Sequence, residues 1–152
     1  MKKILIFCFL LNSSICFCQG YYPYQDIKLE KPADYKSAEP MALSAANFLM
    51  STPFKAKDPN RQNAMTFLMS WMRGTTEIHF MIDNTAQSLA ENKDLFELYS
   101  AALAKFCLEN KGVSNNARLV EISTSKMILA YCDNPANNFS LKKKFRKRLE
   151  SN

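Results

Sequence analysis

Glycine and histidine are scarce in this sequence, and their scarcity excludes several kinds of site. The three glycines stand at positions 20, 74 and 112, too far apart for a glycine-rich loop that cradles a phosphate. This spacing excludes the P-loop and the dinucleotide-binding fingerprint. His79 is the only histidine, whereas a zinc site usually draws several His or Cys ligands from close positions. We therefore expect no metal ion and no cofactor.

Long hydrophobic runs are also absent, apart from a short one at the start. Lys2 and Lys3 precede an uncharged run over residues 4–11, and small cysteines at positions 16 and 18 stand just before Gln19. This layout is typical of a secretory signal peptide. The run is also shorter than the roughly 20 apolar residues that cross a bilayer. Residues 1–18 are thus predicted to be a signal peptide that is removed.

Two alternatives to this cleavage remain open. A lipoprotein signal would acylate Cys16 or Cys18, but Ile15 and Phe17 are not the small residues that precede such a cysteine. An uncleaved signal would instead act as an anchor. The leading interpretation is an exported protein, periplasmic or extracellular. Its cleavage removes three of the five cysteines.

The remaining length suits one domain with a hydrophobic core. Residues 19–38 are rich in Tyr, Pro and Lys and are predicted to form an extended arm that lies on the domain. Residues 39–139 are predicted to be a helical domain, and residues 140–152 a basic amphipathic C-terminal helix. The predicted fold class is all-α, a single compact domain of five or six helices with an extended N-terminal arm.

The helix boundaries follow from proline and capping signals and from apolar periodicity. Glu39-Pro40 and Asp58-Pro59 each predict a helix start, and the second helix is predicted to end with Gly74 as its C-cap. Residues 75–83 predict a short extended connector, because apolar residues alternate there. The other predicted helices cover residues 84–90, 93–110 and 117–132, and a last helix is predicted to be capped by Ser140.

The helix that follows Asp58-Pro59 carries Trp71, the only tryptophan, beside three methionines. A methionine stripe can serve as an adaptable binding surface. A wide apolar face is more often that of a central helix in a bundle. We therefore expect this helix to be the central one and Trp71 to anchor the core.

Cys107 and Cys132 are the thiols that remain after cleavage. In an exported protein such a pair predicts a disulfide, worth about 3 kcal/mol. The bond requires the loop at 110–116 to run extended. In a tight helical hairpin the cysteines would be roughly 20 Å apart, against about 6 Å for bridged Cα atoms. With a tight loop both are buried thiols, and a catalytic pair of either with His79 has the least support.

Six basic residues are concentrated near the C-terminus: Lys142, Lys143, Lys144, Arg146, Lys147 and Arg148. The rest of the chain after the signal is nearly balanced in charge, so no general nucleic-acid surface is expected. Leu141, Phe145 and Leu149 recur every four residues and form a narrow apolar strip. The basic residues could contact an anionic membrane surface or an acidic partner. We expect instead that the strip docks on the domain.

Several strings carry a resemblance to known proteins: the signal that ends before Gln19, "WMRGT", "FCLENKG" and "YCDNPANN". Together they resemble short secreted proteins of Bacteroidota to which no activity is assigned. The resemblance extends over most of the chain after the signal. It implies an exported bacterial protein and implies no catalytic residues.

These observations predict a non-enzymatic helical binding or interaction protein of the bacterial cell envelope, with a protein or small-molecule partner. One alternative is a peripheral module that associates with a membrane surface or a polyanion through the basic C-terminal helix. The other is a small enzyme that uses Cys and His. An enzyme predicts a polar pocket with converging titratable groups, whereas a binding protein predicts an exposed apolar groove.

Overall fold

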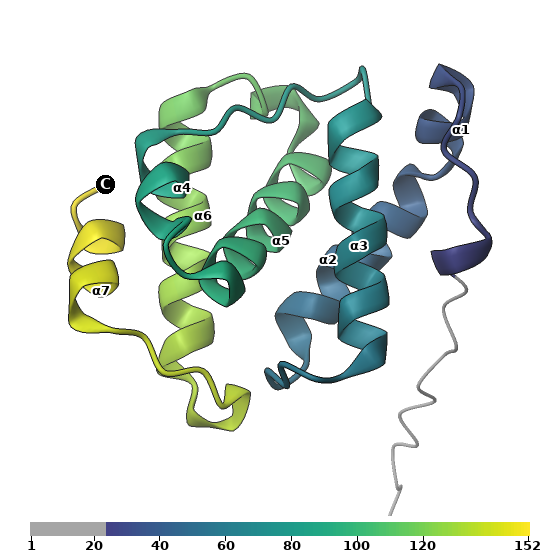
Figure 1. Cartoon of the computed structure of the whole chain (residues 1–152). Coiled ribbons are helices and arrows are strands. Elements are labelled where there is room, and N and C mark those ends of the chain that lie inside the picture. Colours follow the sequence, from purple (N-terminus) through teal and green to yellow (C-terminus); the bar gives the residue numbers. More distant parts are fainter. Residues whose placement is uncertain (1–23) are drawn as a thin grey trace, which may run out of the picture.

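The computed structural model describes residues 24–152, and within this range it contains helices and loops but no strand. The all-α prediction is confirmed, and the helices pack into a compact bundle (Figure 1); these residues form seven α-helices, where five or six were predicted. The signal peptide and residues 19–23 of the arm lie outside the described residues. The helices are α1 (Pro32–Ser37), α2 (Glu39–Ser51), α3 (Pro59–Gly74), α4 (Asn84–Leu89), α5 (Lys93–Glu109), α6 (Ala117–Asp133) and α7 (Lys143–Glu150), with 3-10 turns η1 (Tyr24–Asp26), η2 (Lys111–Val113) and η3 (Pro135–Asn137).

Four of the predicted helix starts, those of α3, α4, α5 and α6, are confirmed by capping bonds. Asp58 accepts from the backbone N–H groups of the first turn of α3, and Asp83 accepts from Ala86 N at 2.6 Å in α4. Asn92 and Asn116 cap α5 and α6 in the same way, each at 3.1 Å. These side chains satisfy backbone donors that have no partner within the helix. The local sequence therefore fixes where most of the helices begin.

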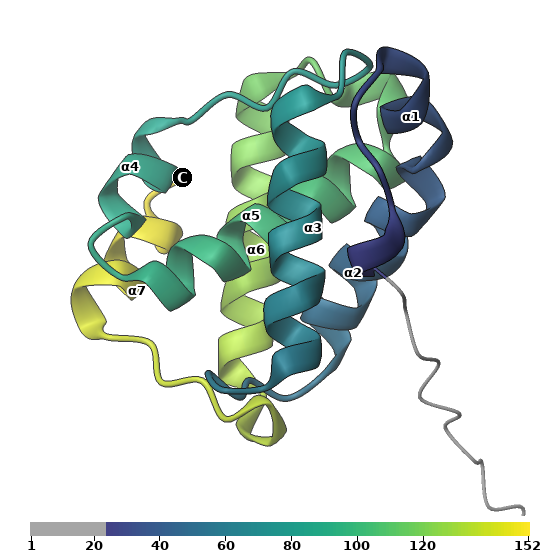
Figure 2. The ribbon, with the colours of Figure 1, turned by 45° about the vertical axis from the view of Figure 1, so that its right-hand side comes forward.

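Helix α5 is the central helix, and it packs against α2, α3, α4 and α6 (Figure 2). The prediction that the Trp71 helix is central is wrong, because α3 packs on one side of α5. The reason is that buried residues occur over most of the circumference of α5, so that other helices cover it on several sides. Trp71 is nevertheless fully buried and anchors the core, as predicted.

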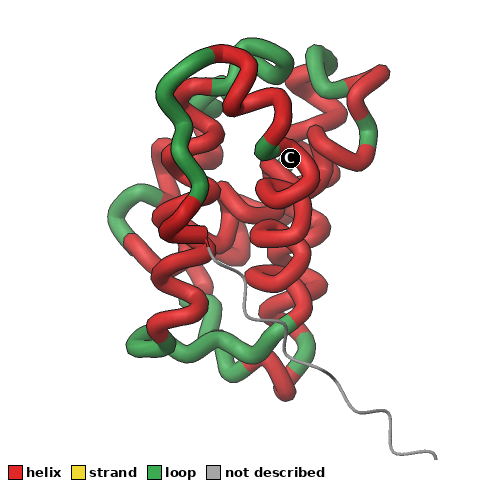
Figure 3. Tube along the Cα trace, turned by 90° about the vertical axis from the view of Figure 1, so that its right-hand side faces the viewer, coloured by secondary structure: helices red, strands yellow, loops and turns green. Residues whose placement is uncertain are grey.

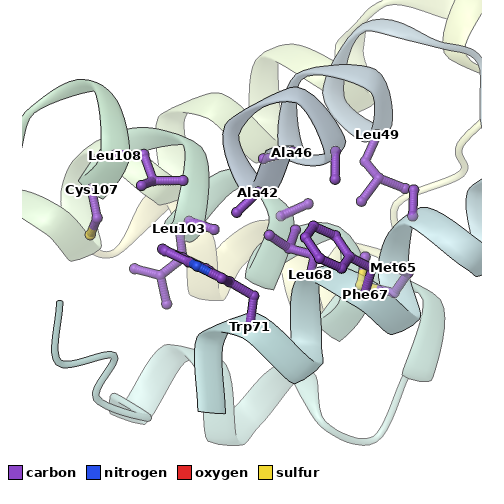
Figure 4. Packing of buried hydrophobic residues seen from close by; sticks show 14 of the residues in the cluster. Ala42, Ala46, Leu49, Met65, Phe67, Leu68, Trp71, Leu103, Cys107 and Leu108 are labelled. Atoms are coloured by element: carbon purple, nitrogen blue, oxygen red, sulfur yellow. The ribbon is translucent and has the colours of Figure 1, made fainter. Parts of the chain in front are cut away.

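Two hydrophobic clusters lie on opposite parts of α5. The first joins α2 and α3 to the second half of α5, and Trp71, Leu68 and Leu103 are among its members (Figure 4). The second joins α4, α6 and α7 to the first half of α5, with Leu95, Leu98 and other buried residues. Helix α5 is therefore the only element that supplies buried residues in quantity to both clusters within residues 24–152.

The segment before α2 is attached to the first cluster. The Tyr24 ring stacks on Phe67 with centroids 5.3 Å apart. The indole N–H of Trp71 donates to the backbone oxygen of Tyr35 at 2.8 Å, and the Tyr35 hydroxyl donates to Leu29 O at 3.0 Å. Residues 32–37, which the sequence placed in the arm, form α1.

Gly74 is needed for a close approach between segments rather than for a left-handed C-cap. It lies inside α3 and the C-cap is Thr75, and no glycine from residue 24 onward has a positive φ. A Cβ at Gly74 would lie 2.1 Å from the Tyr35 ring. The prediction of a Gly74 C-cap is therefore wrong, and the absent side chain makes room for Tyr35.

Residues 75–83 cross one end of the bundle as a loop from α3 to α4 (Figure 3). The predicted connector is therefore present, without strand structure. Ile78 is 3% exposed and points into the first cluster, whereas Met81 and Ile82 are 65% and 66% exposed.

Helix α7 begins at Lys143, three residues after the predicted cap at Ser140. Its N-cap is Lys142, which makes no capping bond through its side chain. Phe145 and Leu149 are 4% and 2% exposed within the second cluster. The apolar strip is therefore docked on the domain, and Leu141 packs against the same cluster from the preceding loop.

The disulfide predicted between Cys107 and Cys132 is not formed, and both thiols are free. The loop at 110–116 is compact, because it contains η2 and three turn hydrogen bonds, from Val113 N to Asn110 O, from Ser114 N to Lys111 O and from Asn116 N to Val113 O. Helix α6 therefore starts beside the end of α5. Cys132 lies near the far end of α6, roughly 20 Å along its axis from the start.

A search for membrane-spanning segments in residues 24–152 finds no helix with the length and apolar character needed to cross a bilayer.

Candidate binding groove beside the end of helix α2

A buried arginine organises the end of α2. Arg61 of α3 is 7% exposed, and its Nη1 donates to Leu49 O at 3.1 Å, to Thr52 O at 3.2 Å and to Thr52 Oγ1 at 2.8 Å. The last carbonyls of a helix lack partners within the helix and carry partial negative charge. A cation at this position both satisfies and neutralises them. Arg61 therefore fixes the angle at which the chain leaves α2.

Tyr131 of α6 binds the same carbonyl, that of Thr52. Its hydroxyl donates to Thr52 O at 2.7 Å, and its own backbone oxygen accepts from Asn137 Nδ2 at 2.9 Å. Asn137 O in turn accepts from Phe54 N at 2.7 Å. Burial raises the pKa of Tyr131, and the charge of Arg61 opposes that rise. The hydroxyl is thus a neutral donor that ties α6 to the end of α2.

Aromatic rings surround the junction at which α3 and α6 contact the end of α2. Phe54 and Phe139 meet edge to face with centroids 4.9 Å apart, and Phe139 also meets Tyr131 at 6.5 Å. The Arg61 guanidinium lies 5.5 Å from the centroid of Phe54. Asn138 turns the chain here with a left-handed φ of 53°, a conformation that Asn adopts more readily than most residues. The junction is therefore rigid on both sides of α2.

An open groove lies beside the junction, lined by α2, α5, α6 and η3. Its volume is about 310 Å³, and its lining residues are Met50, Lys105, Met127, Ala130, Tyr131 and Asn137. Lys105 is held by Asn47 and Glu109. Two methionines, an alanine and a tyrosine ring thus form an apolar surface with few polar groups. We call this feature the α2–α6 groove.

Cys107, Cys132 and His79, the residues of the alternative thiol chemistry, are not among the lining residues of this groove. Burial raises the pKa of Cys107 and of Cys132 to about 11, so both thiols are protonated at neutral pH, whereas catalysis requires a thiolate. His79 is exposed on the loop at 75–83, while Cys107 is 2% exposed in the first cluster. No group of three or more metal-ligating side chains occurs among residues 24–152.

The acids Glu77, Asp83 and Glu91, which lie at the ends of helices and loops, have structural partners. Asp83 caps α4 and accepts from the Tyr99 hydroxyl at 2.9 Å, and burial together with the Asp83 charge raises the pKa of Tyr99. Glu77 lies 3.8 Å from Lys36. Glu91 pairs with Lys144 of α7. These three acids therefore hold helices in place.

The six basic residues of the tail divide into two groups. Lys144, Arg146 and Arg148 pair with Glu91, Asp133 and Glu121, respectively. The remaining lysines are exposed, and no acid of the described chain lies within ion-pair distance of them; they are Lys142, Lys143 and Lys147. Half of the predicted contact residues therefore serve to hold α7 on the domain.

The pairs that hold α7 predict a dependence of stability on pH. A hydrogen bond from Lys144 lowers the pKa of Glu91, and a hydrogen bond from Arg146 lowers that of Asp133. A carboxyl whose pKa is lowered by folding stabilises the folded state above its unfolded pKa, and the stabilisation is lost as the pH falls. The loss should begin near the ordinary pKa values of 4.5 and 3.8.

We therefore expect the double variant Glu91→Gln, Asp133→Asn to be less stable than the parent protein at neutral pH, by a difference that shrinks as the pH falls below the ordinary carboxyl pKa values. The measurement is urea unfolding of both proteins at about pH 7 and about pH 3. A stability difference that stays the same at both pH values would show that these pairs do not titrate with folding.

Comparisons with protein-family models, with curated proteins and with solved structures found no match to this chain. The resemblance to secreted proteins of Bacteroidota stays a prediction.

Sequence reasoning missed the junction altogether. Arg61, Tyr131 and Asn137 lie in separate parts of the chain, and none was predicted to be a site residue. Within α3, Arg61 follows the Asp58-Pro59 start and resembles an ordinary polar residue of a first turn. Only the fold shows that it turns inward.

Proposed function

We propose that the protein is an exported, non-enzymatic binding protein of the bacterial cell envelope and that its ligand lies in the α2–α6 groove. The observation that supports this proposal is the groove itself. It is open and largely apolar, its volume is about 310 Å³, and two methionines line it. Export is supported by the pattern of residues 1–18. The bacterial envelope is supported by the resemblance described above.

The chemistry of the groove favours binding over catalysis. Lys105 is the only charged residue of its lining, and Asn47 and Glu109 hold its ammonium group. An active site of the acid–base or nucleophilic kind needs several titratable groups within reach of one substrate atom. The groove offers instead two flexible thioethers, which adapt to apolar groups of different shapes.

The shape of the groove favours a peptide segment. Its volume is at the lower end of the range for small-molecule sites, and it is largely open to solvent. A groove of this form can receive one or two apolar side chains of an extended or helical segment while the rest of that segment stays in solvent. We therefore expect the ligand to be a protein segment with exposed apolar anchors.

This proposal predicts that peptides selected for binding bind through Met127. A displayed library of random peptides would be selected on the protein and counter-selected on the Met127→Lys variant. The expected result is enrichment of peptides with apolar anchors that lose affinity for Met127→Lys, because a charge would be buried in the contact.

Met81→Lys provides the matched control, because Met81 is 65% exposed on the loop at 75–83. It should leave binding unchanged. Selected peptides that bind Met127→Lys as well as the parent protein, or no enrichment at all, would contradict the assignment of the groove.

A further inference from the structure

A second concave feature also lies near the end of α2. It is a cleft of about 40 Å³ between the loop after α2, the start of α3 and the start of α5. Four charged side chains line it, and they are Lys55, Arg61, Asp94 and Glu97. Apolar residues, among them Leu49 and Leu98, line the rest. We call this feature the Arg61 cleft.

Arg61 presents unused donors to this cleft. The hydrogen bonds of Arg61 to the end of α2 all come from Nη1, and Nε and Nη2 donate to no acceptor among residues 24–152. Neither nitrogen is among the sealed buried atoms that lack a partner, so both remain accessible. No carboxylate of residues 24–152 forms an ion pair with Arg61. A largely buried cation is costly unless opposite charge compensates it.

The acids of the cleft lie on the first turns of α5. Glu97 is 3.7 Å from Lys93, whose ammonium lies on the exposed side of α5, and Asp94 forms no ion pair with any described residue. The cleft thus holds two basic and two acidic side chains, and no basic group contacts an acidic group across it. A plain anion at Arg61 would be repelled by the two acids. A plain cation would be repelled by Arg61 and Lys55.

We propose that the Arg61 cleft binds a small zwitterion, a free amino acid with a short side chain. The carboxylate of the ligand accepts from the free nitrogens of Arg61, and its ammonium group lies toward Asp94 and Glu97. A guanidinium binds a carboxylate through parallel N–H donors better than any other side chain does. The space suffices for about three water molecules, which matches the charged end of an amino acid and excludes a bulky side chain.

Glycine is the probe. Acetate carries only its carboxylate and methylammonium only its ammonium group, so these two compounds serve as controls. The measurement is the Nε–H resonance of Arg61 during titration with each compound. We expect a saturable shift with glycine at an affinity about tenfold higher than that for acetate, and no saturable shift with methylammonium. Equal affinity for glycine and acetate would overturn the proposal, as would the absence of any shift.

Variants of the acids test the orientation of the ligand without disturbing the buried arginine. Asp94→Asn with Glu97→Gln should weaken glycine binding about fivefold and leave acetate binding the same or stronger. Glu109→Gln removes an acid of the same helix outside the cleft, and it should change neither affinity. Unchanged glycine affinity in the double variant would contradict the assignment.

Glycine binding in the Arg61 cleft does not depend on the α2–α6 groove. Met127→Lys should leave glycine binding unaltered, so a failure of the groove and a failure of the cleft can be told apart.

Discussion

Replacement of Gly74 by alanine is expected to lower the free energy of unfolding by about 2 kcal/mol. The new methyl group would lie 2.1 Å from carbons of the Tyr35 ring. The ring cannot move freely, since its hydroxyl donates to Leu29 O and its backbone oxygen accepts from Trp71. An exposed helical site would gain about 1 kcal/mol from the same change, so the sign of the effect identifies the clash. Urea unfolding measures it.

Gly112→Ala is the matched control, because no atom lies within 4 Å of a Cβ at that position. Its effect should stay within about 0.5 kcal/mol. Removal of the ring in Tyr35→Ala should reverse the sign of the Gly74→Ala change, so that the double variant is more stable than Tyr35→Ala alone. Similar losses from Gly74→Ala with and without the Tyr35 ring would mean that the contact has no part in the effect.

Phe145→Ala is expected to cost about 3 kcal/mol, because the ring is 4% exposed and packs in the second cluster with the other residues of α7 and α4. Helix α7 should then detach in part, which circular dichroism and urea unfolding would detect. Binding to anionic vesicles should be weak in the parent protein, since the apolar strip is already buried and three of the six bases are paired.

Lys147→Ala changes an exposed base on the same helix and should leave stability unchanged within about 0.5 kcal/mol. If Phe145→Ala instead left the stability unchanged and abolished strong, salt-sensitive vesicle binding, the strip would be inserted in a membrane rather than docked on the domain.

The helices were predictable where a local signal coincides with a long apolar stripe. Asp58, Asp83 and Asn92 cap helices near the predicted residues because a cap is a contact within one turn. Helix α1 was missed although Pro32 starts it and Asp34 accepts from Lys31 N at 2.9 Å. Its six residues are too few to show apolar periodicity.

The start of α7 shows how a tertiary contact overrides a local signal. Ser140 is a favourable cap residue, but Leu141 packs against the second cluster from outside the helix. The chain therefore stays extended for two more residues. The prediction of a disulfide between Cys107 and Cys132 was wrong for a similar reason. The number of cysteines carries no information on how tightly the loop at 110–116 is folded.

The candidate site depends on distant segments and could not be derived from one sequence. Arg61 and Tyr131 are brought to the same oxygen, Thr52 O, only when α3 and α6 pack around the end of α2. Neither residue has a neighbour in sequence that identifies its role. The methionines of the groove were also not predicted to be site residues, because the methionine stripe that the sequence shows lies on α3.

The position of α5 between the two clusters determines how the molecule unfolds. If either cluster came apart, one apolar side of α5 would lose its cover, so neither half has an intact core without the other. The two halves should therefore unfold in one cooperative step, and amide hydrogens in the middle of α5 should exchange only through global unfolding. A protease would then find α5 accessible only in the fully unfolded chain, and destabilising changes in either half would speed its cleavage equally.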